Sequence, residues 1–221
     1  MSVKRFIHNN SLTLAIFGIF ICSILGMSIV GWSSNNSDLD QHQQAEISYG
    51  QYLISGEFIE GVFENWESEF LQMWALIMLT VFLRQKGSAD SKPLRGKTPL
   101  DTSSRYSIIQ ASSWQQRRKA VGHALYSHSL GLAMLGLFIM AFSLHALGGT
   151  AAYNQDNQFH GSGEVSVWGY MASSQFWYES LQNWQSEFLA IGTLLVLSIK
   201  LRERGSSESK PVGKKFDHET G

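Results

Sequence analysis

Long apolar runs alternate with long polar stretches along the whole chain, which is the pattern of a membrane protein rather than of a soluble core. Apolar runs occupy 12–32 and 129–147, and two more follow the polar segments that start at Glu64 and Gln182. A helix of about 20 residues crosses the hydrocarbon core of a bilayer, which is roughly 30 Å thick. The pattern therefore predicts an all-α membrane protein with four transmembrane helices.

The second half of the chain repeats the first. At a shift of 118 residues, Asn65 and Trp66 align with Asn183 and Trp184, and both halves end in the tripeptide Ser-Lys-Pro. Roughly a third of the aligned positions are identical without a gap, which favours a tandem duplication of a two-helix unit over chance. Two helices per copy give both copies the same orientation. The copies are therefore predicted to be parallel repeats about an axis normal to the membrane.

The duplication divides the chain into four parts. A linker between the repeats is rich in Ser, Pro and Gly and ends in a basic amphipathic segment, which favours contact with lipid head groups over nucleic acid. The four parts are repeat 1 at 1–93 with an outer loop at 33–64, the linker at 94–127, repeat 2 at 128–211 with an outer loop at 148–182, and a tail at 212–221.

Charge gives the predicted topology. All 17 Lys and Arg residues lie before the first helix, between the second and third helices, or at and after the end of the last helix, and the two outer loops contain none. The positive-inside rule then places both termini and the linker in the cytoplasm. The first apolar run is too long for the core of a signal peptide, so it is interpreted as a retained signal anchor.

Each second helix opens with the polar motif Asn-Trp-x-Ser-Glu. The apolar part at 70–83 extends only about 21 Å as a helix, so a spanning helix must include the motif before it. Glu69 and Glu187 are therefore predicted to lie below the outer membrane edge and to face the bundle interior rather than lipid. Asn65 shares a helix face with Glu69, and Asn183 shares one with Glu187.

Two interpretations of this polar motif remain open. In the structural one, Asn65 and Asn183 start the helices, the acids lie near the positive helix end, and the polar groups bond to neighbouring helices. In the functional one, Glu69 and Glu187 form an intramembrane pair that binds a cation or carries protons. The sequence favours the structural interpretation.

The ends of these helices carry further signals. Trp66 and Trp184 suit the aromatic belt at a membrane interface and are predicted to be interface anchors. Arg84 can extend its charged end toward the cytoplasmic surface, and Gly87 suits the left-handed position that follows a helix.

The first helix carries small residues at a spacing of four, Gly18, Cys22 and Gly26. This spacing predicts close helix contact, either between the repeats or between two copies of the chain. Cys22 is the only cysteine, which excludes a disulfide within the chain and a cysteine-based metal cluster.

The outer loops carry two recurring sets of candidate metal ligands, each with spacings of four and four. On a helix such side chains share a face and could hold a divalent metal, and no other cofactor is predicted. The first set, in DLDQHQQAE, fits a helix, whereas the glycines of DNQFHGSGE argue against one. The candidates are Asp38, His42 and Glu46 in the first loop, and Asp156, His160 and Glu164 in the second.

The stretch FENWESEFLQMWALIMLTVFLRQKGSADSKP resembles an uncharacterised family of small bacterial four-helix membrane proteins that carry the signature NWESEFLQ…FLRQKGS-SKP. The resemblance covers both repeats and implies the bacterial cytoplasmic (inner) membrane, but it implies no activity. The second copy departs from the signature, with Gln182 and Gln185 in place of Glu64 and Glu67.

No catalytic motif is evident, so the chain is not expected to be an enzyme. A symmetric haem pair is excluded because His145 and His128 align with Met27 and Asn10. The leading interpretation is a non-enzymatic accessory or structural component that acts by association with other membrane proteins or with itself. The alternative is a small ion- or proton-conducting transporter or channel that uses Glu69 and Glu187. The third is a membrane protein that binds metal on its outer face.

Overall fold

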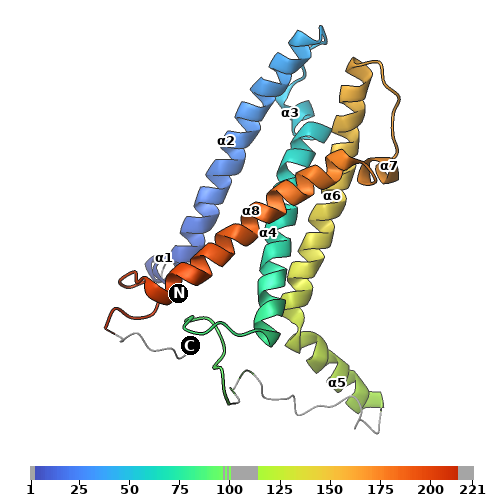
Figure 1. The fold of residues 1–221 in the computed structure, drawn as a ribbon. Helices are drawn as coiled ribbons and strands as arrows, with labels where there is room; N and C mark the ends of the chain where they lie inside the picture. Colours follow the sequence, from blue (N-terminus) through green and yellow to red (C-terminus); the bar gives the residue numbers. More distant parts are fainter. Residues whose placement is uncertain (1–2, 97, 99, 101–113, 214–221) are drawn as a thin grey trace. The chain divides into compact units, whose positions relative to one another are not determined.

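The computed structural model describes residues 3–96, 98, 100 and 114–213, and these residues form eight helices and no strand (Figure 1). The predicted all-α class is confirmed for this part of the chain. In chain order the helices are α1 Val3–Asn9, α2 Ser11–Gln41, α3 Tyr49–Tyr52, α4 Gly56–Phe82, α5 Trp114–Ser127, α6 Ser129–Phe159, α7 Val167–Met171 and α8 Ser174–Lys200.

Two of these helices, α2 and α6, are long and apolar enough to cross a membrane. Each has 31 residues, which corresponds to about 46 Å of helix and exceeds the roughly 30 Å of a hydrocarbon core. Only 6% of the most apolar window of α2 and 17% of that of α6 are buried inside the chain. The core helix of a soluble protein would be mostly buried, so this exposure favours lipid as the surrounding medium. Helices α4 and α8, which the sequence also predicted to span, do not meet the same test of length and composition.

The C-terminal ends of α2 and α6 extend beyond the predicted spans. Each helix continues well past the apolar run, and α4 likewise begins at Gly56 instead of near Glu64. The stretch 33–41 contains no Gly or Pro that would stop a helix, which explains the extension of α2. Both helices end just before a left-handed residue, Gln43 with φ 56° and Gly161 with φ 68°.

Helix lengths and local hydrogen bonds recur at the spacing of 118 residues. Helices α4 and α8 have 27 residues each, as α2 and α6 have 31 each. In the first half, the side-chain amide of Asn36 donates to the carbonyl of Ile47 at 3.0 Å and accepts from its N–H at 3.0 Å. Asn154 makes the same pair with Val165, at 3.0 and 2.8 Å. A carboxamide can do this because it offers both a donor and an acceptor, so it fixes the returning loop to its helix.

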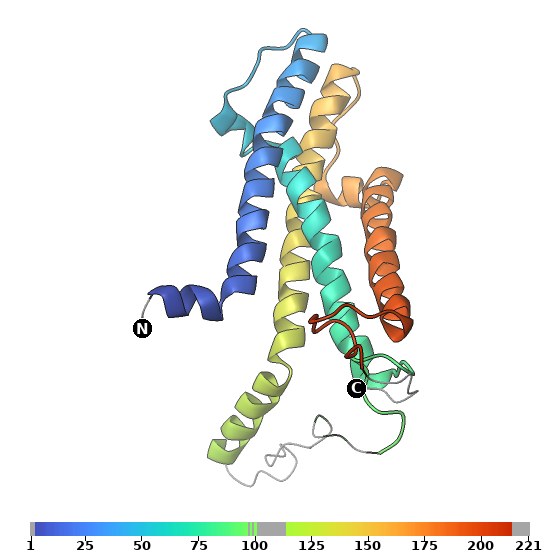
Figure 2. The same cartoon turned by 90° about the vertical axis from the view of Figure 1, so that its left-hand side faces the viewer.

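The contacts within the chain define two compact units, Met1–Phe63 with Leu144–Phe176, and Glu64–Ser143 with Trp177–Gly221. In the first unit the start of α4 touches the outer part of α6 backbone to backbone. A Cβ added at Gly148 would lie 2.7 Å from the backbone nitrogen of Glu60, and one added at Gly56 would lie 2.5 Å from that of Ala152. Figure 2 shows α1 in the same unit as a short helix that turns away from the axis of α2.

In the second unit the later part of α4 contacts α8. Gln72 Nε2 donates to the backbone carbonyl of Glu187 at 3.2 Å. The basic segments after both helices fold alike, because the N–H of Gln85 donates to Ser91 Oγ at 2.8 Å and that of Glu203 donates to Ser209 Oγ at 3.0 Å. Gly87 has the predicted left-handed conformation, with a φ of 88°, and Gly205 has the same φ. Gly87 does not cap α4, because this helix ends earlier, at Phe82, and Gly87 lies in the turn that follows.

The basic amphipathic segment of the linker is helical, as α5. The guanidinium carbon of Arg118 lies 5.2 Å from the centre of the Trp114 ring, a cation–π contact between side chains one turn apart. Trp114 is itself exposed. A cation and an aromatic ring therefore lie together on the surface of α5. Helices that lie at a membrane interface carry the same two kinds of residue.

Candidate functional site

The predicted acid pair lies partly on the surface. Glu69 is exposed and Glu187 is half-buried, and Glu69 is close enough to act electrostatically on Glu187. The fully buried acid of this region is Glu67, which has no exposed surface. Trp184 Nε1 donates to Glu67 Oε1 at 2.9 Å. Because residues two apart on a helix differ by about 200° in direction, Glu67 and Glu69 point to opposite sides of α4.

The helix starts also differ from the sequence interpretation. Asn65 and Asn183 lie inside α4 and α8, so the interpretation that they start these helices is wrong. Asn183 Nδ2 instead donates back along its own helix to the carbonyl of Glu179 at 3.2 Å. The capping side chains are serines: Ser55 Oγ accepts from the N–H of Phe58 at 3.3 Å, and Ser173 Oγ accepts from that of Phe176 at 3.3 Å.

The two predicted tryptophan anchors are both half-buried. Trp66 meets Phe70 edge to face, with ring centres 6.4 Å apart. Trp184 contacts Phe138 at 6.5 Å and Trp177 at 6.3 Å, in addition to its bond to Glu67. Trp184 therefore has an internal polar partner, which an anchor in the head-group region does not need.

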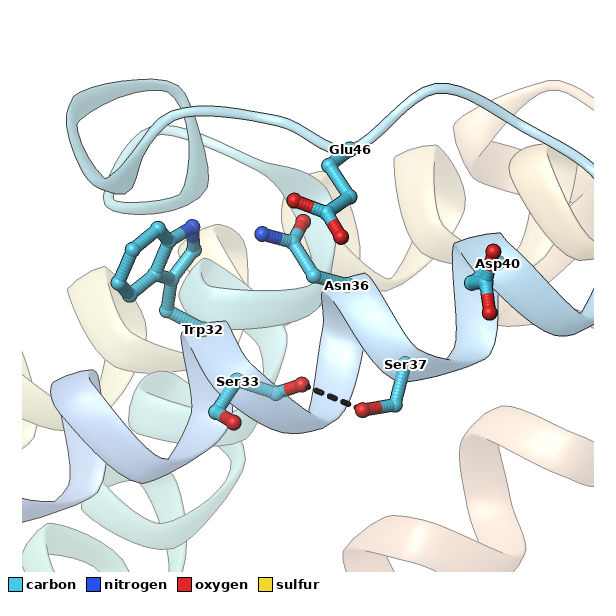
Figure 3. Close-up of a pocket in the computed structure, with 6 residues that line it drawn as sticks. All are labelled: Trp32, Ser33, Asn36, Ser37, Asp40 and Glu46. Atoms are coloured by element: carbon cyan, nitrogen blue, oxygen red, sulfur yellow. Dashed lines mark hydrogen bonds between the residues drawn. The ribbon is translucent and has the colours of Figure 1, made fainter.

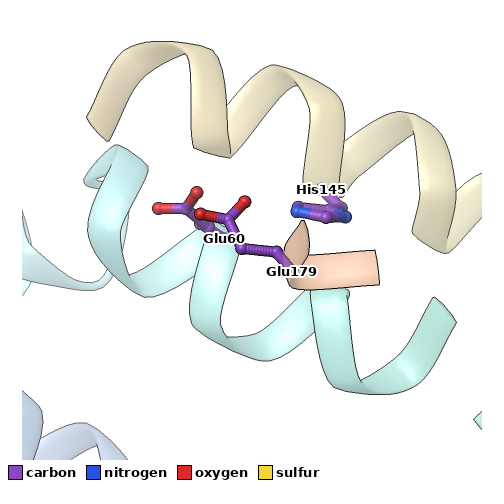
Figure 4. Close-up of side chains that lie close together, drawn as sticks. All are labelled: Glu60, His145 and Glu179. Carbon is purple, nitrogen blue, oxygen red and sulfur yellow. The ribbon is translucent and has the colours of Figure 1, made fainter. Parts of the chain in front are cut away.

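A buried polar cluster that the sequence did not predict lies in the first unit and consists of Glu60, His145 and Tyr170. Tyr170 Oη donates to Glu60 Oε1 at 2.8 Å. A ring nitrogen of His145 and a carboxylate oxygen of Glu60 lie within 4.8 Å of each other (Figure 4). His145 and Tyr170 have no exposed surface. The cluster joins α4, α6 and α7, whose residues are far apart in sequence.

The side chains of this cluster are closely packed. The His145 ring stacks on Phe176 with centres 4.8 Å apart and 24° between the planes, and Phe176 meets Tyr170 edge to face at 5.5 Å. A Cβ added at Gly149 would lie 2.5 Å from Tyr170 Oη and 2.7 Å from Glu60 Oε1. Only glycine at this position admits the phenol and the carboxyl group together.

The groups of this cluster can bind a proton or a cation. A carboxyl group that accepts from a phenol and lies near an imidazole combines three groups that exchange protons, and two of them, His145 and Tyr170, are buried. Glu179, also drawn in Figure 4, belongs to the second unit.

The repeat could not reveal this cluster, since Glu60 and His145 align with Tyr178 and Met27. The available signal was a histidine within an apolar run. An ionisable residue inside a predicted membrane helix is by default a candidate site.

The outer candidate ligands are brought together in a different combination from the one predicted. In the described part of the chain, neither triad has its three ligand atoms within 4.8 Å of one another. Glu46 lies over Asn36 in an open pocket of about 280 Å³, which Figure 3 shows with Asp40 farther along α2. Glu164 accepts from Gln158 Nε2 at 3.0 Å. The two histidines, His42 and His160, lie next to each other with ring centres 6.0 Å apart.

One acid near the outer loops has a perturbed pKa. Glu57 lies in the first turn of α4, outside the segments that could span a membrane. Partial desolvation, and secondly the charge of Asp38, raise the pKa of Glu57 above its ordinary value. Desolvation, and secondly the charge of Glu57, raise the pKa of Tyr52. The acidic group therefore holds its proton more tightly than a carboxyl group in water does.

Comparison with known proteins gives a family and no activity. No curated protein and no solved structure matches the chain. One family matches residues 3–221, which is nearly the whole sequence, and it agrees with the resemblance carried by the helix-to-exit signature. The chain therefore belongs to the family described as Domain of unknown function (DUF6766).

Proposed function

We propose that the chain is a four-helix integral membrane protein of the cytoplasmic membrane that is not an enzyme and acts by association, as an accessory or structural component. The observation that carries this proposal is the exposure of α2. Its apolar side chains are exposed all around the helix, from Leu12 at 73% to Val30 at 69%, which suits contact with lipid or with another membrane helix.

The small-residue seam of α2 supports association. A Cβ added at Gly18 or Gly26 would meet nothing within 4 Å, and Cys22 is exposed. Within the first unit, no described residue fills this seam, which leaves it open to another helix. Close contact along such a seam is the way membrane helices associate when lipid offers no hydrophobic driving force.

The proposal takes α4 and α8 as the second and fourth spans, and it takes the two halves as copies of one ancestral unit. Support comes from the equal helix lengths and from the recurring amide, serine and left-handed positions at a spacing of 118 residues. Support for a cytoplasmic location of both termini comes from the absence of Lys and Arg in the outer loops.

Cross-linking through Cys22 in native membranes tests association along the seam. Oxidation should give a covalent dimer, or a covalent complex with a partner present in stoichiometric amount. The matched control is Phe20→Cys combined with Cys22→Ser, which moves the thiol to about the opposite side of α2. A chain that is monomeric by native mass spectrometry, and whose Cys22 cross-links no better than the control, would contradict the proposal.

The second candidate function is proton or cation transport, and the buried ionisable groups are the observation that favours it. Glu67, His145 and Tyr170 are buried, and Glu60, which is half-buried, accepts a hydrogen bond from Tyr170. Ionisable groups in such positions cost folding free energy, so they are candidates for a functional role. This extends the earlier alternative, in which Glu69 and Glu187 carry the ion.

Proteoliposome flux separates the two candidates. If transport is the function, Glu60→Gln or Glu187→Gln should abolish proton or cation flux while the melting temperature stays near that of the parent chain. Transport would be excluded if the flux is the same in the parent chain, in these variants and in empty liposomes. Glu46 is exposed, and Glu46→Gln serves as the control for loss of a carboxylate that takes no part in transport.

A further inference from the structure

The outer ends of α2 and α6 meet at a pair of histidines within the first unit. The ring centres of His42 and His160 are 6.0 Å apart, with the planes at 69°. His42 also stacks on Phe159, with centres 4.7 Å apart and 16° between the planes. Both histidines are partly exposed, so a solute can reach them. Each histidine comes from one half of the chain, at matching positions.

Each histidine is held by the same local contact. The Nδ1 atom of His42 lies 2.9 Å from the backbone carbonyl oxygen of Asp38, and that of His160 lies 2.9 Å from the carbonyl oxygen of Asp156. A carbonyl oxygen can only accept a hydrogen bond, so Nδ1 carries the hydrogen in both rings. In the neutral imidazole this leaves the lone pair on Nε2.

This arrangement is the one that metal-binding histidines have. A ligating imidazole typically donates its other N–H to a backbone carbonyl or a carboxylate, which fixes the ring and its tautomer. Carboxylate oxygens lie beside both rings as well, at 3.7 Å for Asp38 and His42 and at 3.4 Å for Asp156 and His160. They lie on the Nδ1 side of each ring, where their negative charge favours the Nδ1–H donor and leaves Nε2 available to a cation.

We propose that His42 and His160 together form one site for a divalent transition-metal ion, with Zn²⁺ or Cu²⁺ as the class of ion that imidazole nitrogen selects. An ion shared by the two rings would lie about 2.0–2.1 Å from each Nε2 atom, and water would complete the coordination. The site differs from the two predicted triads because it takes one ligand from each loop. It goes beyond the proposed function, which needs no metal.

The alternative is that the rings only pack against each other and Phe159. Titration of the full chain with Cu²⁺ distinguishes the two, using protein without a polyhistidine tag and electron paramagnetic resonance to count coordinated imidazole nitrogens. The parent chain should bind one ion per chain with two imidazole nitrogens. His42→Gln and His160→Gln should each leave one nitrogen and lower the affinity at least about tenfold.

His8→Gln is the matched control, because His8 is exposed on α1 and far from this place in the sequence, and it should bind as the parent chain does. Circular dichroism confirms that each variant keeps its helices. A parent chain that binds no Cu²⁺ or Zn²⁺ above the level of the double variant His42→Gln, His160→Gln would overturn the proposal. So would two-nitrogen coordination that persists in that double variant.

Discussion

Trp184 donates a hydrogen bond of 2.9 Å from its indole N–H to the carboxyl group of Glu67, which has no exposed surface. The bond joins α8 to α4 within the second unit. The equivalent of Glu67 in the other half is Gln185, which is exposed and donates only to Gln182 on its own helix, at 3.1 Å. Glu67 and Gln185, which align at the shift of 118 residues, therefore make different hydrogen bonds.

Replacing Glu67 tests this internal bond. Glu67→Gln keeps an acceptor for the indole, so its unfolding free energy should stay near that of the parent chain. Glu67→Leu leaves a half-buried N–H without its acceptor and should lower stability by about 1–3 kcal/mol. Gln185→Leu is the matched control at the exposed position and should cost little. Thermal unfolding in detergent measures all three, and equal losses for Glu67→Leu and Gln185→Leu would show that the bond contributes nothing.

The second prediction concerns the glycine beside the buried cluster. Gly149→Ala places a methyl group against Tyr170 and Glu60, so overpacking should cost about 1–3 kcal/mol. Gly136→Ala on the same helix meets nothing within 4 Å and should be neutral or stabilising by up to about 1 kcal/mol, since alanine favours helix. Melting temperatures of the two variants check this contrast. If Gly149→Ala is as stable as Gly136→Ala, the close contact at α6 does not exist.

A pH-dependent effect is expected at Glu57, whose pKa is raised in the folded chain by desolvation and then by Asp38. The folded state binds this proton more tightly than the unfolded state does, so ionisation lowers stability as pH rises from the ordinary carboxyl range, near about 4.3, through the folded pKa. Glu57→Gln cannot ionise and should melt at a higher temperature than the parent chain near neutral pH.

The gain in melting temperature from Glu57→Gln should shrink as the pH falls toward the ordinary carboxyl range, where the parent carboxyl group is protonated in both states. Asp38→Asn should recover part of the same gain, because it removes the second cause of the shift. The exposed Glu46→Gln controls for the loss of one negative charge. A gain that is the same at acidic and neutral pH would rule out ionisation of Glu57 as its origin.

Sequence reasoning predicted the all-α class and the two apolar helices α2 and α6, because an apolar run is a property of a single segment. It also predicted the left-handed conformation of Gly87, since glycine adopts a positive φ without steric cost. It did not identify the buried acid, because Glu67 and Glu69 are two residues apart and only the neighbouring helix decides which one faces inward. The Asn-Trp motif similarly drew attention away from Ser55, the residue that caps α4.

The buried cluster was out of reach for a different reason. Glu60, His145 and Tyr170 come from three helices. At the positions related by the shift of 118 residues, Glu60 aligns with Tyr178, His145 with Met27 and Tyr170 with Tyr52. Only Tyr170 is matched by the same residue type, so a search for symmetric polar sets discards the cluster. Contacts between distant segments depend on packing, which periodicity does not encode.

Membrane topology is the central claim, and single-cysteine labelling in a Cys22→Ser background tests it most directly. The reagent is an impermeant thiol probe applied to intact cells. The four positions are Ser37, Leu94, Ser162 and Ser207, all exposed in the structure. Four spans with cytoplasmic termini predict labelling at Ser37→Cys and Ser162→Cys, and protection at Leu94→Cys and Ser207→Cys until the cells are permeabilised. If only α2 and α6 cross the membrane, Leu94→Cys is labelled and Ser162→Cys is protected, and that result would contradict the four-helix account.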